Sequence, residues 1–171
     1  MKHTRQYTWE GVQEGVNSIA MQLFKDEWRP DYIVGITRGG LVPAVLLSHA
    51  TDIPMKTLCV QLESDGLEAN TERNAQMARD ALKNNKKILI IDDINDTGKT
   101  LSWIREDWVA SMGGASYDAS AWGDTVRTAC LIDNQASGFD GMDYTALEIN
   151  KMEEDVWVVF PWEGERDYGN F

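Results

Sequence analysis

The chain has little positive charge, and this deficit excludes several classes of function. Its 171 residues include 16 Lys and Arg against 28 Asp and Glu, which gives a formal net charge of −12 at pH 7. Sequence-independent binding to nucleic acid depends on Lys and Arg that neutralise phosphates. Binding to an anionic membrane surface depends on a basic amphipathic face. We therefore expect neither a nucleic-acid partner nor a membrane partner.

Long apolar runs and abundant cysteines are also lacking. No stretch approaches the roughly 18 apolar residues that indicate a membrane span, and the first residues lead into no signal-like apolar segment. The two cysteines, Cys59 and Cys130, each lie inside an apolar run. This is typical of buried free thiols rather than of a disulfide framework or a metal cluster. The length and the 43% apolar content predict one domain over residues 1–171, in the cytoplasm.

The hydrophobic pattern alternates between helical and strand periods. Helical spacing covers residues 9–26, 41–50, 77–82 and 101–112. Short aliphatic runs predict strands at 32–36, 57–62, 87–91, 126–132 and 156–160, with a weaker strand at 144–149. This alternation predicts an α/β fold whose mostly parallel sheet is covered by helices on both faces. In such a sheet the ligand lies beyond the carboxyl ends of the strands.

Two polar stretches interrupt the alternation. Residues 63–76 contain one large apolar residue, Leu67, and predict a mobile loop or lid. Residues 113–123 are small and polar, and they predict a surface excursion.

The segment 87–101 carries the clearest chemical pattern. An aliphatic strand ends in Asp92 and Asp93, and Asp96 then precedes Thr97-Gly98-Lys99-Thr100 at the start of a helix. A helix N-terminus offers unpaired N–H groups and a positive dipole end, and the glycine lets the backbone approach a phosphate closely. The two aspartates would face sugar hydroxyls or Mg²⁺. The segment predicts a phosphate site, whereas the alternative is an acidic strand end followed by an ordinary capped helix.

Three segments carry a resemblance to a known family. Residues 90–100, Ile-Ile-Asp-Asp-Ile-Asn-Asp-Thr-Gly-Lys-Thr, resemble the phosphoribosyl pyrophosphate signature of the type I phosphoribosyltransferases. Residues 34–43, which contain Arg-Gly-Gly-Leu-Val-Pro, resemble the pyrophosphate loop of the bacterial xanthine–guanine branch of this family. Residues 155–163, Asp-Val-Trp-Val-Val-Phe-Pro-Trp-Glu, resemble the base-binding stretch of that branch, and Tyr7-Thr8-Trp9 is similar too. The resemblance implies a type I phosphoribosyltransferase fold, with a small hood formed by the chain ends.

The resemblance also implies a reaction. A Mg²⁺-dependent enzyme would transfer the 5-phosphoribosyl group from phosphoribosyl pyrophosphate to guanine, xanthine or hypoxanthine. The products would be a nucleoside 5′-monophosphate and pyrophosphate, as in purine salvage, and relatives form homodimers or homotetramers. Two alternatives stay open: transfer to an aminopurine, a pyrimidine or a modified base, and a non-catalytic regulator that binds phosphoribosyl pyrophosphate or a nucleotide.

Matching positions carry the implied roles of individual residues. Phosphoribosyl pyrophosphate would contact Arg38, Gly39, Asp92, Asp93, Asp96, Thr97, Gly98, Lys99 and Thr100, and Asp96 would also be the general base. The nucleobase would contact Asn134, Trp157 and Val158, and Mg²⁺ would be held by Asp92, Asp93 and Glu163. The alternatives make Arg38 a turn residue, Trp157 a core residue and Glu163 a solvated charge. His3 and His49 match no family position, and Trp103, Trp108, Trp122 and Trp162 are interpreted as packing or subunit contacts.

The sequence departs from the family at three places. Purine enzymes carry a lysine after the strand that corresponds to residues 126–132, where it donates to the 6-oxo group, whereas residues 131–135 read Leu-Ile-Asp-Asn-Gln. The amide of Asn134 falls at or beside that position and could donate or accept. The Ser-Tyr pair of the catalytic loop has no counterpart near Leu62 and Glu63, and the stretch 113–125 is longer than in the bacterial enzyme. The preferred base therefore stays open.

Overall fold

The computed structural model of the chain describes residues 3–63, 66–111 and 121–164. Helices and strands alternate along most of it. In chain order they are β1 (His3–Gln6), α1 (Trp9–Lys25), β2 (Tyr32–Thr37), α2 (Leu41–Thr51), β3 (Met55–Glu63), β4 (Gly66–Ala69), α3 (Thr71–Leu82), β5 (Ile88–Asn95), α4 (Lys99–Ser111), β6 (Val126–Asn134), β7 (Tyr144–Ile149) and β8 (Val156–Val159).

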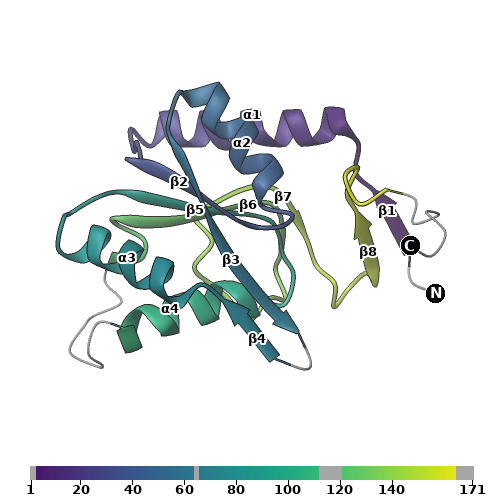
Figure 1. Ribbon diagram of the computed structural model, residues 1–171. Coiled ribbons are helices and arrows are strands. Elements are labelled where there is room, and N and C mark those ends of the chain that lie inside the picture. The colour runs from purple at the N-terminus through teal and green to yellow at the C-terminus, as the bar shows by residue number, and fades with distance from the viewer. Residues whose placement is uncertain (1–2, 64–65, 112–120, 165–171) are drawn as a thin grey trace.

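A six-stranded sheet forms the centre of the molecule (Figure 1). Its order is β4-β3-β2-β5-β6-β7, and every neighbouring pair is parallel except β3 with β4. β1 and β8 pair in parallel as a separate two-stranded sheet to one side. The predicted α/β fold and the hood from the two chain ends are therefore confirmed.

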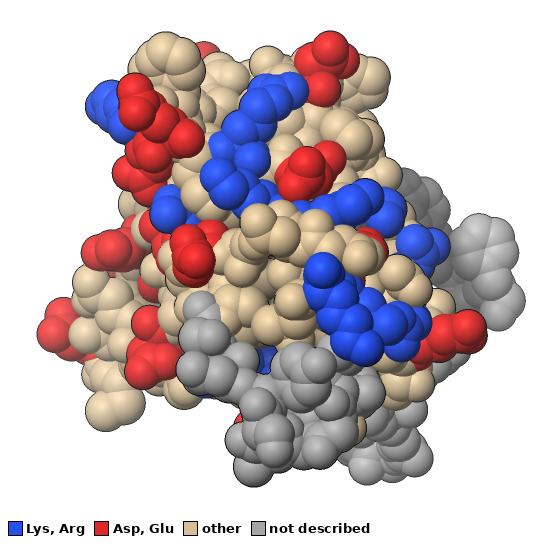
Figure 2. Space-filling model, turned by 90° about the vertical axis from the view of Figure 1, so that its left-hand side faces the viewer, with Lys and Arg blue, Asp and Glu red and all other residues tan. Residues whose placement is uncertain are grey.

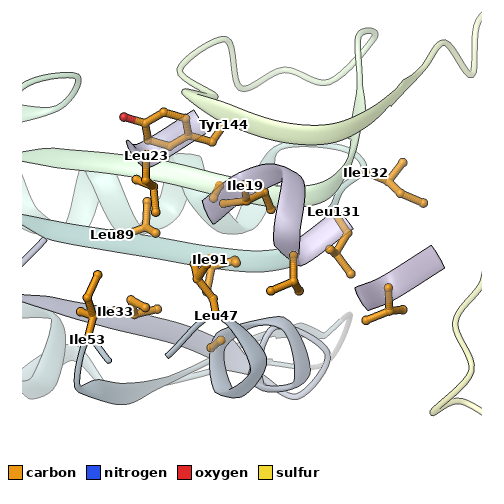
Figure 3. Packing of buried hydrophobic residues seen from close by; sticks show 14 of the residues in the cluster. Ile19, Leu23, Ile33, Leu47, Ile53, Leu89, Ile91, Leu131, Ile132 and Tyr144 are labelled. Atoms are coloured by element: carbon orange, nitrogen blue, oxygen red, sulfur yellow. The ribbon is translucent and has the colours of Figure 1, made fainter. Parts of the chain in front are cut away.

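Two hydrophobic cores hold helices against the two faces of the sheet. On one face, helices α1 and α2 bury residues such as Ile19 and Leu47 against Ile33, Leu89 and Ile91 of the strands (Figure 3). On the other face, α3 and α4 cover alternate strand residues, including Ile88, Ile90 and Val126. Strands buried on both faces explain the continuous aliphatic runs of the sequence.

The predicted loop at 63–76 is wrong, because it holds β4 and the first half of α3. The β3–β4 pairing uses main-chain hydrogen bonds, which need no apolar side chains. Asn70 caps α3, and its side chain accepts a hydrogen bond from the Arg73 backbone N–H at 2.9 Å. The buried face of this first half uses the polar Asn74, which bonds to Ile104 and Asp107 of α4. A count of apolar residues could not detect that face.

Two strands of the sheet extend beyond their predicted ends. β5 continues to Asn95 and β6 to Asn134, because Ile94 still pairs with Ile132 and Asn95 with Asp133. β1 was not predicted, since its four side chains are exposed and it pairs through its backbone alone. Residues 113–120 of the predicted excursion lie outside the described residues.

Cys130 is buried and Cys59 half-buried, and both are free, so buried thiols are confirmed for Cys130 and in part for Cys59. Burial raises the pKa of the Cys130 thiol well above its usual range. Among the described residues, none of the helices combines the length and the apolar character needed to cross a membrane.

Candidate functional site

The carboxyl ends of the parallel strands meet at one edge of the sheet, beside the hood (Figure 1). Three of the predicted segments lie there: the turn 38–40 after β2, the loop 96–98 after β5, and Asn134 at the end of β6. The parallel register gathers at this edge residues that are far apart in the sequence.

The turn after β2 packs directly against the end of β5. A Cβ atom added at Gly39 would lie 1.8 Å from Oδ2 of Asp93, so only glycine fits beside that carboxylate. The peptide bond between Thr37 and Arg38 is cis, and the Arg38 side chain is exposed. The predicted pyrophosphate turn and the predicted ribose carboxylates are therefore in contact.

Asp92 and Asp93 form a crowded carboxylate pair. The backbone N–H of Asp93 donates to Asp92 Oδ1 at 2.9 Å, and the N–H of Ile94 donates to Asp93 Oδ1 at 2.8 Å. Burial, followed by the charge of Asp93, raises the pKa of Asp92 well above its usual range. Burial also raises the pKa of Asp93, with a contribution from the charge of Glu163. Within the described part of the chain, no ion pair compensates either carboxylate.

The loop between β5 and α4 lines a small concave pocket. Its lining consists of Asp92, Ile94, Asn95, Asp96, Thr97, Gly98, Lys99, Thr100 and Leu101. Gly98 has a φ of +80°, and an added Cβ would lie 2.4 Å from the Phe139 backbone nitrogen. The loop thus depends on glycine for its turn and for its packing on the β6–β7 connection. The first residues of α4, Lys99 to Leu101, line this pocket, so the N-terminus of the helix lies where a phosphate site requires it.

Asn134 is 5% exposed, and its side-chain amide joins two loops of this edge. Its Nδ2 donates to the Asp96 backbone carbonyl at 2.8 Å. Its Oδ1 accepts hydrogen bonds from the backbone N–H groups of Ala136 at 3.2 Å and Lys151 at 3.0 Å. The predicted base-contacting amide is therefore engaged with the protein itself.

Lys151 is a site residue that the sequence interpretation missed. Its Nζ lies 2.8 Å from Oδ1 of Asp96, the predicted general base, and 5.8 Å from the ring centroid of Trp157. The missed signal was topological. Because Asn134 pairs with Ile149 in neighbouring parallel strands, a residue just past Ile149 lies at the same edge as the end of β6.

Trp157 and Val158 lie in the hood strand β8. Strand alternation buries Val156 and Val158 and leaves the Trp157 side chain 52% exposed, so the core interpretation of Trp157 does not hold. The four tryptophans interpreted as packing or subunit contacts do pack within the chain. Trp108 contacts Trp122 edge-on, the Trp162 ring stacks on Phe160 with centroids 4.6 Å apart, and Trp103 packs against the core beneath α3 and α4.

Glu163 lies in the turn after β8, and its carboxylate Oε2 accepts a hydrogen bond from the Phe160 backbone N–H at 2.9 Å. Among the described residues, no group of three or more His, Cys, Asp or Glu is gathered closely enough to hold a metal ion. Mg²⁺ is commonly held by one or two carboxylates together with substrate phosphates and water. The carboxylate pair at Asp92 and Asp93 therefore fits a Mg²⁺ ion that arrives with a diphosphate, rather than one held by the protein alone.

Comparison with known proteins identifies the family of the chain. The family model of the phosphoribosyl transferase domain matches residues 5–168. A xanthine-guanine phosphoribosyltransferase from Roseobacter denitrificans is 28% identical over 172 residues, covering 94% of this chain and 86% of the relative. A xanthine-guanine phosphoribosyltransferase from Nitratidesulfovibrio vulgaris is 25% identical over 163 residues, with 94% and 85% covered.

Solved structures share the fold as well. A purine phosphoribosyltransferase from Pyrococcus horikoshii superposes with a TM-score of 0.67 at 27% identity, over 98% of this chain and 99% of that one. A xanthine-guanine-hypoxanthine phosphoribosyltransferase from Helicobacter pylori superposes with a TM-score of 0.68 at 18% identity, over 95% and 94% of the two chains.

Proposed function

Because the chain belongs to the phosphoribosyl transferase domain family, we propose that it transfers the 5-phosphoribosyl group from phosphoribosyl pyrophosphate to a purine base. The products would be a purine nucleoside 5′-monophosphate and pyrophosphate. The names of the relatives from Roseobacter denitrificans and Pyrococcus horikoshii support the purine acceptor. Guanine, xanthine and hypoxanthine are the proposed bases.

One observation of the structure carries the proposal. The turn at Gly39 lies against Asp93, and the pocket of the helix-opening loop begins at Asp92. We expect the turn at Gly39 to contact a diphosphate, the two aspartates to contact the hydroxyls of a sugar, and the loop pocket to hold a second phosphate. These groups follow one another in the same order in phosphoribosyl pyrophosphate. The raised pKa values of both aspartates are typical of carboxylates at functional sites and support this proposal.

The proposed roles follow from this order. Loop residues Asp96 to Thr100 hold the 5′-phosphate through backbone N–H groups, hydroxyls and Lys99. Asp92 and Asp93 accept hydrogen bonds from the ribose hydroxyls and face the shell of a substrate-bound Mg²⁺. Arg38 and the backbone at Gly39 contact the diphosphate, while Trp157 and Val158 contact the base. Glu163 remains a predicted metal contact.

In the proposed reaction these residues act mainly through positioning and electrostatics rather than through covalent chemistry. As the bond between C1′ and the pyrophosphate oxygen breaks, positive charge develops on the ribose and negative charge on the leaving group. When bound, Mg²⁺ would neutralise part of the diphosphate charge. Arg38 would add a second positive charge there, and Asp96 would take or shield the purine proton that becomes more acidic.

A turnover assay with a panel of bases tests the proposal. We expect pyrophosphate release from phosphoribosyl pyrophosphate and Mg²⁺ with at least one purine. If adenine, uracil or another base supports turnover and the oxopurines do not, the acceptor is misassigned. If no base does, yet calorimetry shows that phosphoribosyl pyrophosphate binds, the protein is a non-catalytic sensor.

The role of Asp96 has a separate test. The substitution Asp96→Asn keeps the size of the side chain but removes its basicity. We expect kcat to fall about 100-fold, as for the loss of a general base, whereas the Kd for phosphoribosyl pyrophosphate changes much less. Equal losses in the two constants would contradict the general-base role.

The proposal extends to the setting of the enzyme. A cytoplasmic location, a homodimeric or homotetrameric assembly and the lack of a nucleic-acid partner remain predictions. Light scattering on the purified chain measures the assembly directly.

A further inference from the structure

The base end of the candidate site contains a cation that none of the proposed roles uses. The Lys151 side chain is 20% exposed, and its Nζ lies 2.8 Å from Asp96 Oδ1. The same Nζ is 5.8 Å from the indole centroid of Trp157. The ammonium therefore lies between the proposed proton acceptor and the proposed stacking platform.

Hydrogen bonds fix the turn that carries this lysine. The Lys151 backbone N–H donates to Asn134 Oδ1 at 3.0 Å, and the neighbouring N–H of Met152 donates to Asn150 Oδ1 at 3.1 Å. The backbone N–H groups of Glu153 and Glu154 then bond to the Asn150 carbonyl. Asn134 also binds the Asp96 carbonyl, so a single buried amide positions both partners of the ion pair.

The chemistry of an ammonium group determines what it would select. A lysine has three N–H donors and no acceptor. One donor faces Asp96, and the others can bond to an oxygen at the edge of a planar ring. Trp157 is 52% exposed, and a planar base stacked on its indole would place its edge near Nζ, which lies 5.8 Å from the ring centroid. A ring carbonyl would accept from Nζ, whereas an exocyclic amino group would meet it donor to donor.

We propose that Lys151 is a specificity-determining residue that donates from Nζ to a carbonyl oxygen of the base stacked on Trp157. It thereby favours oxopurines over aminopurines. Asp96 orients the ammonium, and Asn134 acts as a positioning residue for both. This inference rests on the proposed function, which it deepens by naming the residue that selects the oxopurine.

The substitution Lys151→Met keeps the length of the side chain and removes its donors. We expect kcat/KM for hypoxanthine to fall about 10- to 100-fold, because the oxygen of the base loses its partner. The KM for phosphoribosyl pyrophosphate should change less than threefold, and the ratio of hypoxanthine to adenine turnover should fall at least tenfold. Lys151→Arg, which restores donors, should recover part of the ratio.

The matched control is Lys56→Met, because Lys56 is also paired with an aspartate, Asp80, at 3.9 Å, at the opposite edge of the sheet. It should leave the base ratio unchanged. A binding measurement separates this inference from the proposed function. Calorimetry should show that Lys151→Met raises the Kd for guanosine 5′-monophosphate more than the Kd for adenosine 5′-monophosphate. That preference can be measured even if the wild type turns over no base.

Three results would overturn the inference. One is a Lys151→Met variant whose turnover and binding equal those of the wild type for both the oxopurine and the aminopurine. Another is an equal loss for both bases, which would reduce Lys151 to a partner of Asp96. The third is a wild-type protein that binds neither monophosphate, and this result would also reject the proposed function.

Discussion

Carboxylates at the two edges of the sheet have opposite pKa shifts. At the edge where strands begin, Asp80 accepts hydrogen bonds from Tyr32 at 2.9 Å, Gln76 at 3.1 Å and Asn84 at 3.3 Å. Burial by itself would raise the pKa of Asp80, but these hydrogen bonds, with the charge of Lys56, lower it. At the edge where strands end, Asp92 and Asp93 crowd each other and their pKa values are raised. A compensated carboxylate stabilises the fold, whereas the raised pKa values of the pair are typical of a functional site.

The face remote from the hood carries charges of both signs. Figure 2, which faces the left-hand side of Figure 1, shows Lys and Arg side chains across this face with Asp and Glu side chains beside them. Exposed basic residues such as Arg29, Lys86 and Lys87 precede strands there. The predicted phosphate site lies at the opposite edge, where it would rely on backbone N–H groups, Lys99 and Arg38.

Asp92→Asn should have the largest effect on this comparison. It removes a charge from the uncompensated pair, and we expect kcat/KM for phosphoribosyl pyrophosphate to fall about 100-fold, equivalent to about 2.7 kcal/mol. The free energy of unfolding should rise at pH 7, because a costly buried charge is gone. Steady-state kinetics and urea unfolding measure the two changes. Lost activity together with lost stability would make Asp92 a structural residue like Asp80.

Gly39→Ala tests the contact that brings two predicted segments together. Its Cβ would lie 1.8 Å from Asp93 Oδ2, so the turn and the carboxylate must separate. We expect kcat/KM to fall by about tenfold to 100-fold, as for a misplacement of about 1 Å. Gly11→Ala is the control, because its Cβ meets Thr8 Oγ1 at 3.4 Å, an ordinary contact. Normal kinetics for Gly39→Ala would show that this contact does not shape the site.

Asp80→Asn tests the compensated edge. Its amide turns a donor toward groups that donate to Asp80, so we expect the free energy of unfolding to fall by roughly 1–3 kcal/mol. The kcat/KM should stay within about twofold, because the residue lies at the edge remote from the site. Urea unfolding followed by far-UV circular dichroism measures the loss. A stability equal to the wild type would argue against the compensation.

The smallest expected effect is the pH dependence of stability, which should differ between Asp80 and Asp92. The lowered pKa of Asp80 gives stability that is present above its unfolded pKa of about 3.9 and lost as the pH falls through the folded pKa. The raised pKa of Asp92 acts in reverse, so stability decreases as the pH rises from about 3.9 through the folded value. The loss in free energy of unfolding caused by Asp80→Asn should therefore shrink toward pH 3. The gain in free energy of unfolding caused by Asp92→Asn should shrink toward pH 4. Urea midpoints across pH 3–8 measure both trends, and parallel curves for the two variants would contradict them.

Much of the fold was predictable because buried parallel strands leave continuous aliphatic runs. Strands β2 and β5 and helix α1 were found this way, with ends displaced by a few residues in β5. The segment 63–76 could not be read in this way. Its strand pairs through the backbone, and its helix buries Asn74 in hydrogen bonds to α4. Neither feature leaves an apolar period in the sequence.

Local patterns were enough to predict the alternating architecture and the loop at Asp96 to Thr100, because both depend on residues that are neighbours in the chain. The contact of Gly39 with Asp93 and the position of Trp157 outside the core depend on the packing of strands instead. The tertiary structure also supplied a lysine from a position that no motif marks, since Lys151 reaches Asp96 through the register of β6 with β7. Contacts of this kind are set by strand order and register, which join residues that local patterns cannot relate.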